Sequence, residues 1–205
     1  MQNSVIAKQA GTKKADNDWS PYDNNGGTVV AIAGDDYVII AADTRLIQSY
    51  DILSRKVSKL HQLTNKCIMG SGGCFTDTIT LQKVLDYHIK QYKFDHNEVI
   101  STPALASLLS TTLYGRRMFP YYTFNIIAGL DNEGHGAIYS YDAVGSFETL
   151  VYSVQGEGQN LIIPLLDSCI PKKNRNEPVV PLSFEESMNL IKESFTLAGE
   201  TYCCW

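Results

Sequence analysis

The sequence predicts an α+β domain built from two antiparallel sheets that are covered by helices. Three observations support this class: short β-branched runs come in pairs separated by turn-forming residues, helical patterns follow the first pairs, and a further helical pattern lies near the end of the chain. Each sheet and each helix stripe has an apolar face to bury. The order of elements is hairpins, two helices, further hairpins and then helices. This order therefore indicates two sheets whose outer faces are covered by helices.

Residues 1–25 form the first segment. They are polar, lack periodicity and end at a turn-forming cluster of two asparagines and two glycines. We therefore expect a leader or flexible arm over 1–25 and a single folded domain over 26–205. Within the domain, the first four strands are expected to form two hairpins: 28–33 with 37–42, and 59–63 with 67–70.

Two consecutive helices are predicted next, because apolar residues then recur at the i, i+3, i+4 spacing of an amphipathic helix. The first is expected to begin with Thr76 or Asp77 as its cap. The second has Ser101 as a cap and Pro103 in its first turn, and its apolar stripe runs to about Tyr114.

The second half of the chain returns to strands and then to helices. A hairpin is predicted over 122–129 and 137–141, and a further strand over 150–154. Residues 159–167 are apolar but contain Pro164, so a helix there either begins near that proline or is kinked at it. Ser183 and Glu186 have the spacing of a capping box and predict the start of a final helix.

Composition and charge exclude several classes of protein. The chain has 205 residues, of which 44% are hydrophobic and 19% charged, as in an ordinary globular domain. Its net charge of -5 and the absence of a basic run argue against a nucleic-acid partner. The apolar runs are too short to cross a bilayer, so we expect no membrane association. The five cysteines are an odd number and do not suggest a disulfide framework, so we expect a reduced intracellular compartment. We expect no cofactor and no metal, because no phosphate-binding glycine loop and no metal-spaced Cys or His cluster occurs.

Asp43 directly follows an apolar strand, and Arg45 lies two residues further on. Taken alone, the two residues are best explained as a local ion pair at a strand end. The strings 26–31, 41–45 and 58–59 together, however, resemble the opening of proteasome β subunits, which are N-terminal nucleophile hydrolases. This resemblance implies a four-layer αββα sandwich of two antiparallel sheets flanked by helices.

In active members, the resemblance implies a threonine that self-cleavage exposes at the start of the first strand, an aspartate 16 residues later and a lysine 32 residues later. The freed amine serves as the base, while the lysine and aspartate set protonation and orientation. The residue that lies 16 positions before Asp43 and 32 positions before Lys59 is Gly27, which has no hydroxyl. We therefore expect a non-catalytic subunit in which Asp43 and Lys59 are relics of the site.

Two alternatives remain open at this stage. Thr28 could be the nucleophile after cleavage between Gly27 and Thr28, although the first strand would then slip by one residue and reverse which side chains face the core. The chain could also be a separate N-terminal nucleophile hydrolase that acts on small amides.

Three later segments, 115–122, 125–131 and 136–146, are similar to the member at the sixth position of the β ring, which has no peptidase activity. Ala143 departs from the family, which tends to have proline there. Residues 198–205 form a divergent tail, and we expect the last strands of the family fold to be missing. The resemblance implies the other β subunits of a seven-membered ring, the α ring and a second β ring as partners, protein degradation as the process, and cytoplasm and nucleus as the location.

Overall fold

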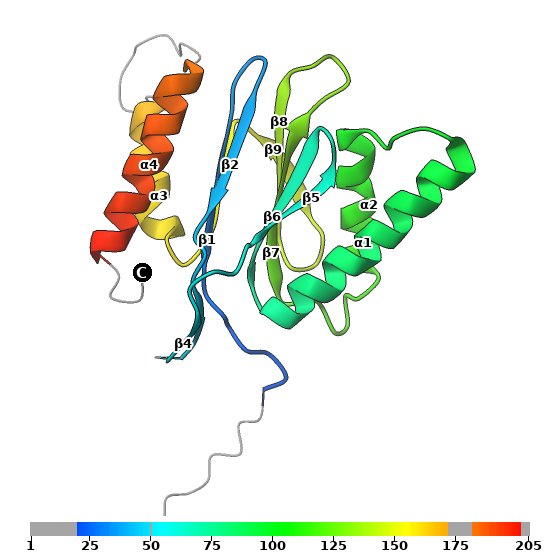
Figure 1. Cartoon of the computed structure of the whole chain (residues 1–205), viewed down its shortest axis with the longest axis horizontal. Helices are drawn as coiled ribbons and strands as arrows, with labels where there is room; N and C mark the ends of the chain where they lie inside the picture. The colour runs from blue at the N-terminus through cyan, green and yellow to red at the C-terminus, as the bar shows by residue number, and fades with distance from the viewer. Residues whose placement is uncertain (1–19, 50, 172–181, 202–205) are drawn as a thin grey trace, which may run out of the picture.

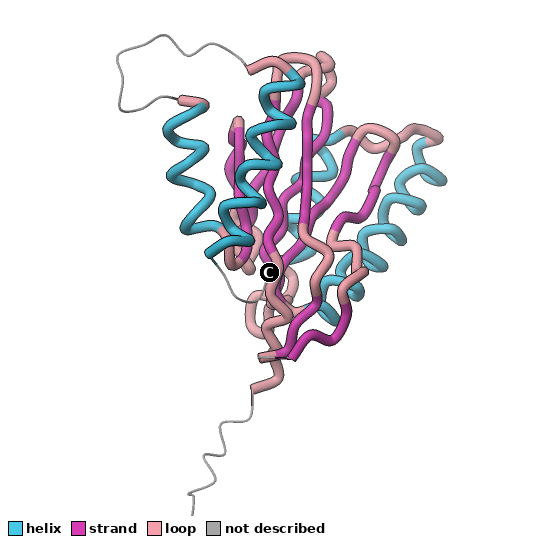
Figure 2. The backbone as a smooth tube through the Cα atoms, turned by 60° about the vertical axis from the view of Figure 1, so that its left-hand side comes forward, coloured by secondary structure: helices cyan, strands magenta, loops and turns pink. Residues whose placement is uncertain are grey.

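The computed structural model describes residues 20–49, 51–171 and 182–201. In this part of the chain the elements form four layers, with a pair of helices on each outer side and two sheets between them (Figure 1). Figure 2, turned by 60°, shows the same succession of helices, strands and helices. The predicted α+β sandwich is therefore confirmed.

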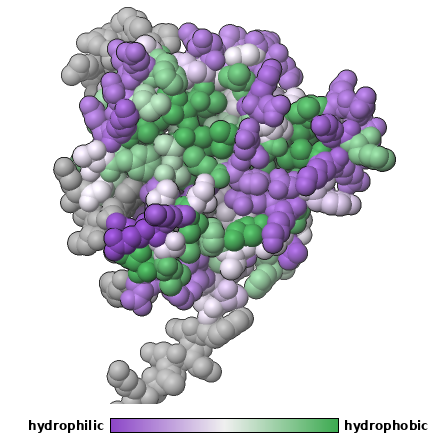
Figure 3. Space-filling model, in the orientation of Figure 1, coloured by the Kyte–Doolittle hydropathy of each residue, from purple (hydrophilic) through white to green (hydrophobic). Residues whose placement is uncertain are grey.

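The first sheet has three antiparallel strands in the order β10-β1-β2, and two helices cover its outer face. The elements of this half are β1 (Thr28–Ala33), β2 (Val38–Ala42), β10 (Tyr152–Gly156), α3 (Gln159–Cys169) and α4 (Phe184–Thr201). Strand β2 lies at the edge of the sheet. Figure 3 shows hydrophobic residues gathered on the face between α4 and β2.

The second sheet has five antiparallel strands in the order β5-β6-β7-β8-β9, and the other helix pair covers it. Its elements are β5 (Leu60–Thr64), β6 (Cys67–Gly73), α1 (Phe75–His96), α2 (Thr102–Tyr114), β7 (Thr123–Leu130), β8 (Gly136–Tyr141) and β9 (Phe147–Leu150). All strand pairs in it join neighbours along the chain, with the two helices inserted between β6 and β7.

The core is divided by the two faces of β1. Val29 and Ala31 pack between the sheets with side chains of β7 and β8, whereas Val30 and Ile32 pack under α3 and α4. All four side chains have at most 1% of their surface exposed. Because successive side chains of a strand point to opposite faces, this alternation fixes the register of β1, on which the geometry of the site depends.

Several predicted elements are confirmed with small shifts in their ends, and one predicted cap is wrong. The Ser101 hydroxyl accepts the Ala104 amide at 3.4 Å and caps α2. Neither Thr76 nor Asp77 caps α1, because the N-cap position is Cys74. The Asp77 carboxylate instead accepts the backbone N–H of Tyr122 at 2.9 Å, so this acidic residue fastens α1 to the segment that enters β7.

The predicted strand 150–154 is also corrected. It is divided between β9 and β10, which belong to different sheets, and the chain crosses from one sheet to the other around Val151. Pro164 lies inside α3 without ending it, and its side chain is exposed. A short ribbon of β3 (Leu46–Gln48) and β4 (Asp51–Ser54) was not predicted, because its short strands have no alternating pattern.

The two ends of the chain bear on predictions made from the sequence. Most of the predicted leader, residues 1–19, lies outside the described residues. The capping box of the last helix is confirmed, since the Ser183 hydroxyl and Glu186 carboxylate make reciprocal bonds to each other's backbone N–H. Of the predicted tail 198–205, helix α4 includes residues up to Thr201, and 202–205 lie outside the described residues. Among the described helices, none combines the length and apolarity that a bilayer crossing requires.

Candidate functional site

The candidate site lies at the end of the sandwich where β1 begins and β2 ends. These strands are antiparallel, with Val29 opposite Ala42. Gly27, just before β1, is therefore brought next to Asp43, just after β2. Lys59, directly before β5, extends to the same place from the second sheet, so three separate segments of the chain meet there.

Lys59 and Asp43 form a buried ion pair. The Lys59 Nζ lies 2.8 Å from the Asp43 Oδ2, and the two side chains are 4% and 15% exposed. The same ammonium also donates to the backbone carbonyl of Asp43 at 3.3 Å and to the backbone carbonyl of Arg45. A lysine ammonium has three N–H donors, and each of them has an oxygen here.

The Asp43 carboxylate is held from its other side by backbone amides. Its Oδ1 accepts the Thr28 N–H at 2.7 Å, and its Oδ2 accepts the Arg45 N–H at 3.1 Å. Both carboxylate oxygens therefore have charge-assisted hydrogen bonds within the protein. This network ties the start of β1 to the loop after β2 and fixes the orientation of the ion pair.

Gly27 lies against the aliphatic part of Lys59. A Cβ at this position would be 2.3 Å from Cε, 2.7 Å from Cδ and 3.1 Å from Nζ of Lys59. The backbone φ of Gly27 is 100°, which side chains other than that of glycine rarely tolerate. A side chain at residue 27 would thus collide with the end of the Lys59 side chain, and the present packing has no room for one.

The backbone nitrogen of Gly27 is also unsuited to act as a base. It is joined to Gly26 in a peptide bond, and the amide resonance that makes this bond planar removes the basicity of the nitrogen. In this form the cluster has an ammonium and a carboxylate but neither a nucleophilic oxygen nor a free amine.

Thr28 has its hydroxyl in a different environment. The side chain is fully buried, and its Oγ1 accepts the backbone N–H of Gly158 at 2.9 Å, at the start of α3. Thr28 bonds to Asp43 through backbone groups: its N–H donates to Oδ1, and its carbonyl accepts the Asp43 N–H at 3.2 Å. The structure therefore brings Gly27, Asp43 and Lys59 together and directs the Thr28 hydroxyl to another partner.

Sequence reasoning did not identify Glu157, which lies beside the cluster. Burial raises the pKa of its carboxyl, the negative charge of Asp43 raises it further, and the positive charge of Lys59 opposes both effects. Glu157 lines a cavity of about 300 Å³ together with residues of the chain entering β1 and of β6, β7, β10 and α3: Asn24, Gly26, Gly27, Gly73, Phe124, Gln155, Gly156 and Gln159. Its position just after a strand would have been the only signal in the sequence.

Asn25 is the second residue that sequence reasoning missed, because it was interpreted only as part of a turn. Its side-chain Nδ2 donates to the carbonyl of Ile47 at 3.0 Å, and its Oδ1 accepts the N–H of Phe75 at 2.9 Å. Its own N–H donates to the carbonyl of Gly73 at 3.1 Å. These bonds tie the segment before Gly27 to β3, to α1 and to β6, so the chain enters the site along a fixed path.

Across residues 20–49, 51–171 and 182–201, no group of three or more His, Cys, Asp or Glu side chains is arranged to hold a metal ion. The charged groups of the Lys59 cluster instead bind each other and nearby backbone groups. Taken as chemistry, the cluster can stabilise the strand ends that it joins, and it contains no group that is placed to attack a carbonyl carbon.

Comparisons with known proteins point to one family. A family model described as "Proteasome subunit" matches residues 23–193. "Proteasome subunit beta type-1" of Arabidopsis thaliana is 50% identical over 190 residues, which cover 89% of this chain and 84% of the relative. The protein of the same name from Dictyostelium discoideum is 48% identical over 182 residues, covering 87% and 77%. "Proteasome subunit beta type-6" of Saccharomyces cerevisiae is 38% identical over 209 residues, covering 97% and 87%.

Proposed function

This chain belongs to the proteasome subunit family and is a β subunit, and we propose that it takes part in the 20S core without cleaving peptide bonds itself. The observation that carries the proposal is the identity of residue 27. Gly27 occupies the position toward which Lys59 and Asp43 converge, and it has no hydroxyl. In a comparable serine protease, removal of the nucleophile lowers turnover by about a millionfold.

We propose that the Asp43–Lys59 pair has a structural role in place of a catalytic one. A buried charge that loses its partner is strongly destabilising, by about 3–5 kcal/mol, so a chain that keeps one member of the pair must keep both. The pair also joins β1, the loop after β2 and the start of β5 through backbone hydrogen bonds. These bonds give the pair a use that does not depend on catalysis.

The contacts of Thr28 argue against the alternative in which this residue is the nucleophile. To act with Lys59, its hydroxyl would have to leave the Gly158 N–H and move to the opposite face of β1. Such a slip would also move the buried Val29 and Val30 to the wrong sides of the sheet. The second alternative, a separate hydrolase of small amides, has no supporting contact in the described residues.

The chain assembles with other proteasome subunits, and we propose that it does so in a seven-membered β ring, against an α ring and a second β ring, in the cytoplasm and nucleus. Large exposed apolar side chains support extensive contacts with neighbours. Phe94 on α1 and Met118 after α2 are 88% and 95% exposed, and Phe184 at the start of α4 is 52% exposed. These residues belong to both helical layers and to a connecting loop.

Incorporation of a tagged chain tests this proposal. Wild-type and Thr28→Val chains should both elute in a particle with other proteasome subunits, and the two particles should cleave a panel of fluorogenic peptides at equal rates per particle. Thr28→Val removes the hydroxyl but keeps the shape, so loss of one cleavage specificity would identify Thr28 as a nucleophile. Elution of the chain only as an active monomer or small dimer would contradict its role in the ring, and imaging of the tag tests the proposed location.

A further inference from the structure

The end of α2 and the segment that follows it present an exposed surface of arginines, aromatic rings and a methionine. All residues from 114 to 119, which we call the 114–119 surface, are exposed, and Met118 and Phe119 have 95% and 60% of their area exposed. Backbone hydrogen bonds hold this segment in turns, among them the bond from the Phe119 N–H to the Arg116 carbonyl at 3.0 Å. The surface therefore has a defined shape before anything covers it.

The two guanidinium groups of this surface lie on aromatic rings. Arg116 is 5.2 Å from the centroid of the Tyr121 ring, and Arg117 is 5.7 Å from that of Tyr114. Among the described residues, no carboxylate oxygen lies within 4.0 Å of either guanidinium group. Since arginine is suited to bind a carboxylate through two parallel N–H bonds, both side chains are available for an acidic partner.

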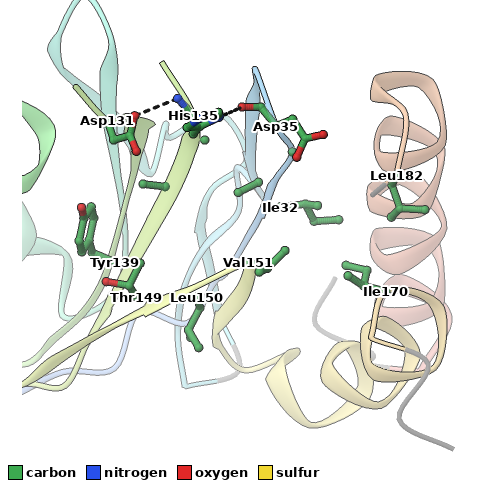
Figure 4. Close-up of a pocket in the computed structure, with 14 residues that line it drawn as sticks. Ile32, Asp35, Asp131, His135, Tyr139, Thr149, Leu150, Val151, Ile170 and Leu182 are labelled. Carbon is green, nitrogen blue, oxygen red and sulfur yellow. Dashed lines mark hydrogen bonds between the residues drawn. The ribbon is translucent and has the colours of Figure 1, made fainter. Parts of the chain in front are cut away.

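Acidic residues on the elements around this surface already have other hydrogen-bond partners. The Asp77 carboxylate accepts a backbone N–H of the chain entering β7, and that of Asp23 accepts a side-chain amide from β3. The Asp142 carboxylate accepts two N–H groups within its own turn, between β8 and β9. Another acidic group lies at the far end of the eight-residue strand β7, about 25 Å away and beside a cavity of about 580 Å³ (Figure 4): Asp35 and Asp131, with His135 hydrogen-bonded to both.

The chain that enters the domain is anchored at the edge of this surface. The Tyr22 ring lies 5.4 Å from the rings of Phe119 and Tyr122, and its hydroxyl donates to the Pro120 carbonyl at 2.8 Å. Position 19 is three residues before Tyr22 and position 16 is six before it, which allows about 10 Å and about 20 Å of extended chain. Because no residue of the surface is more than five positions from Phe119, the preceding chain can reach all of it.

Residues 15–19 directly precede the described part of the chain and have the chemistry that complements this surface. They include Asp16, Asp18 and Trp19 and no basic residue, and two lysines precede them at positions 13 and 14. Two carboxylates match the two guanidinium groups in number and in sign of charge. A tryptophan side chain offers about 150–250 Å² of area to the exposed methionine and phenylalanine.

We propose that residues 15–19 fold back onto the 114–119 surface in the unassembled chain. The two carboxylates pair with the two arginines, and Trp19 packs against Met118 and Phe119. The side chains that this segment covers are ones that a neighbouring subunit could contact. Docking of the segment and contact with a neighbour through this surface therefore exclude each other. The docking itself does not depend on whether the candidate site is inert.

The fluorescence of Trp19 measures this docking in the full chain. The chain has two tryptophans, so Trp205→Phe gives a parent chain in which Trp19 is the only one. At low salt, acrylamide should quench the parent about twofold less effectively than a variant with Arg116→Gln and Arg117→Gln. Sodium chloride at about 1 M, where the Debye length is about 3 Å, should increase quenching of the parent. Equal quenching of the parent and the arginine variant would overturn the proposal.

A matched variant separates pairing at this surface from a general effect of net charge. Lys90→Gln with Lys93→Gln also removes two positive charges from exposed positions. Both lysines lie on α1, about 20 Å or more along the helix from Asp77, the residue that bonds to the chain entering β7. This control should leave the quenching of Trp19 unchanged. An effect as large as that of the arginine variant would contradict pairing at the 114–119 surface.

An exchange of charges tests the pairing itself. Asp16→Arg with Asp18→Arg should increase the quenching of Trp19, and the further addition of Arg116→Asp and Arg117→Asp should restore its protection. Far-ultraviolet circular dichroism checks that each variant is folded. A folded exchange variant that does not regain protection would contradict the proposal. Protection that is lost on dilution would assign the contact to a second chain and would also overturn it.

Discussion

Replacing Gly27 with alanine should destabilise the chain more than the same change at a glycine of similar backbone conformation. Gly134 provides the control: its φ is 93°, close to the 100° of Gly27, and a Cβ there would have no neighbour within 4 Å. Gly134→Ala therefore introduces only the cost of a left-handed backbone, about 1–2 kcal/mol. Gly27→Ala adds a Cβ that would lie 2.3 Å from the Lys59 Cε.

This clash can be relieved only by moving a buried side chain. The Lys59 ammonium donates to three oxygens and cannot shift without weakening the ion pair. Overpacking of this kind costs about 1–3 kcal/mol, so Gly27→Ala should destabilise the chain by about 2–5 kcal/mol in total. The difference of about 1–3 kcal/mol between the two variants is the part that depends on Lys59.

Urea-induced unfolding of the full chain, followed by far-ultraviolet circular dichroism, measures both variants. The double variant Gly27→Ala with Lys59→Ala adds a second check, because a truncated Lys59 no longer contacts the new Cβ. The cost of the two changes together should then be about 1–3 kcal/mol less than the sum of the single costs. Equal losses for Gly27→Ala and Gly134→Ala, or full additivity with Lys59→Ala, would refute the idea that Lys59 occupies the space of the missing side chain.

Three further predictions concern the ion pair, Thr28 and His135. Lys59→Met should cost about 3–5 kcal/mol in urea unfolding, and adding Asp43→Asn should recover part of that loss; a further loss would contradict a mutually compensating pair. Thr28→Val leaves the Gly158 N–H without a partner and should cost about 1–3 kcal/mol, whereas Thr28→Ser should cost clearly less; equal losses would show that the hydroxyl bond is unimportant. Bonding to a backbone carbonyl and nearby carboxylates raise the pKa of His135, so its stabilising effect should be complete below pH 6.5 and disappear as the pH rises through the higher folded-state pKa. A nuclear magnetic resonance titration of its ring that gives an ordinary or lower pKa would contradict this sign.

Much of the fold could be predicted because local signals in the sequence agree with the packing. The β-branched run of β1 is buried as expected, and Ser101 and Ser183 cap the helices predicted after them. Burial of β2 was overestimated, because this strand lies at the edge of the described sheet and only Ile39 in it is buried. The failures have a common cause. Aspartate is a common helix cap, but the Asp77 carboxylate instead accepts the backbone N–H of Tyr122, 45 residues away in the chain.

The division of the predicted strand 150–154 could not be seen from local pattern either. Nothing in the sequence around Val151 indicates that the preceding residues pair with β8 and the following ones with β1. At the site, the sequence spacing of Asp43 and Lys59 was enough to predict that residue 27 lies beside them. It could not show that the Lys59 side chain lies in the space where another residue would place a Cβ, nor that Asn25 fixes the entering chain.

An inert site at Gly27 requires that the peptide bond between Gly27 and Thr28 stays uncut and that residue 27 carries no nucleophile. Mass spectrometry of this chain, isolated from the native particle after treatment with a threonine-directed epoxyketone, measures both properties at once. We predict a peptide in which Gly27 and Thr28 are still joined, and no adduct anywhere on the chain. A mature chain that begins at Thr28, with the reagent bound to its amine and hydroxyl, would contradict the account.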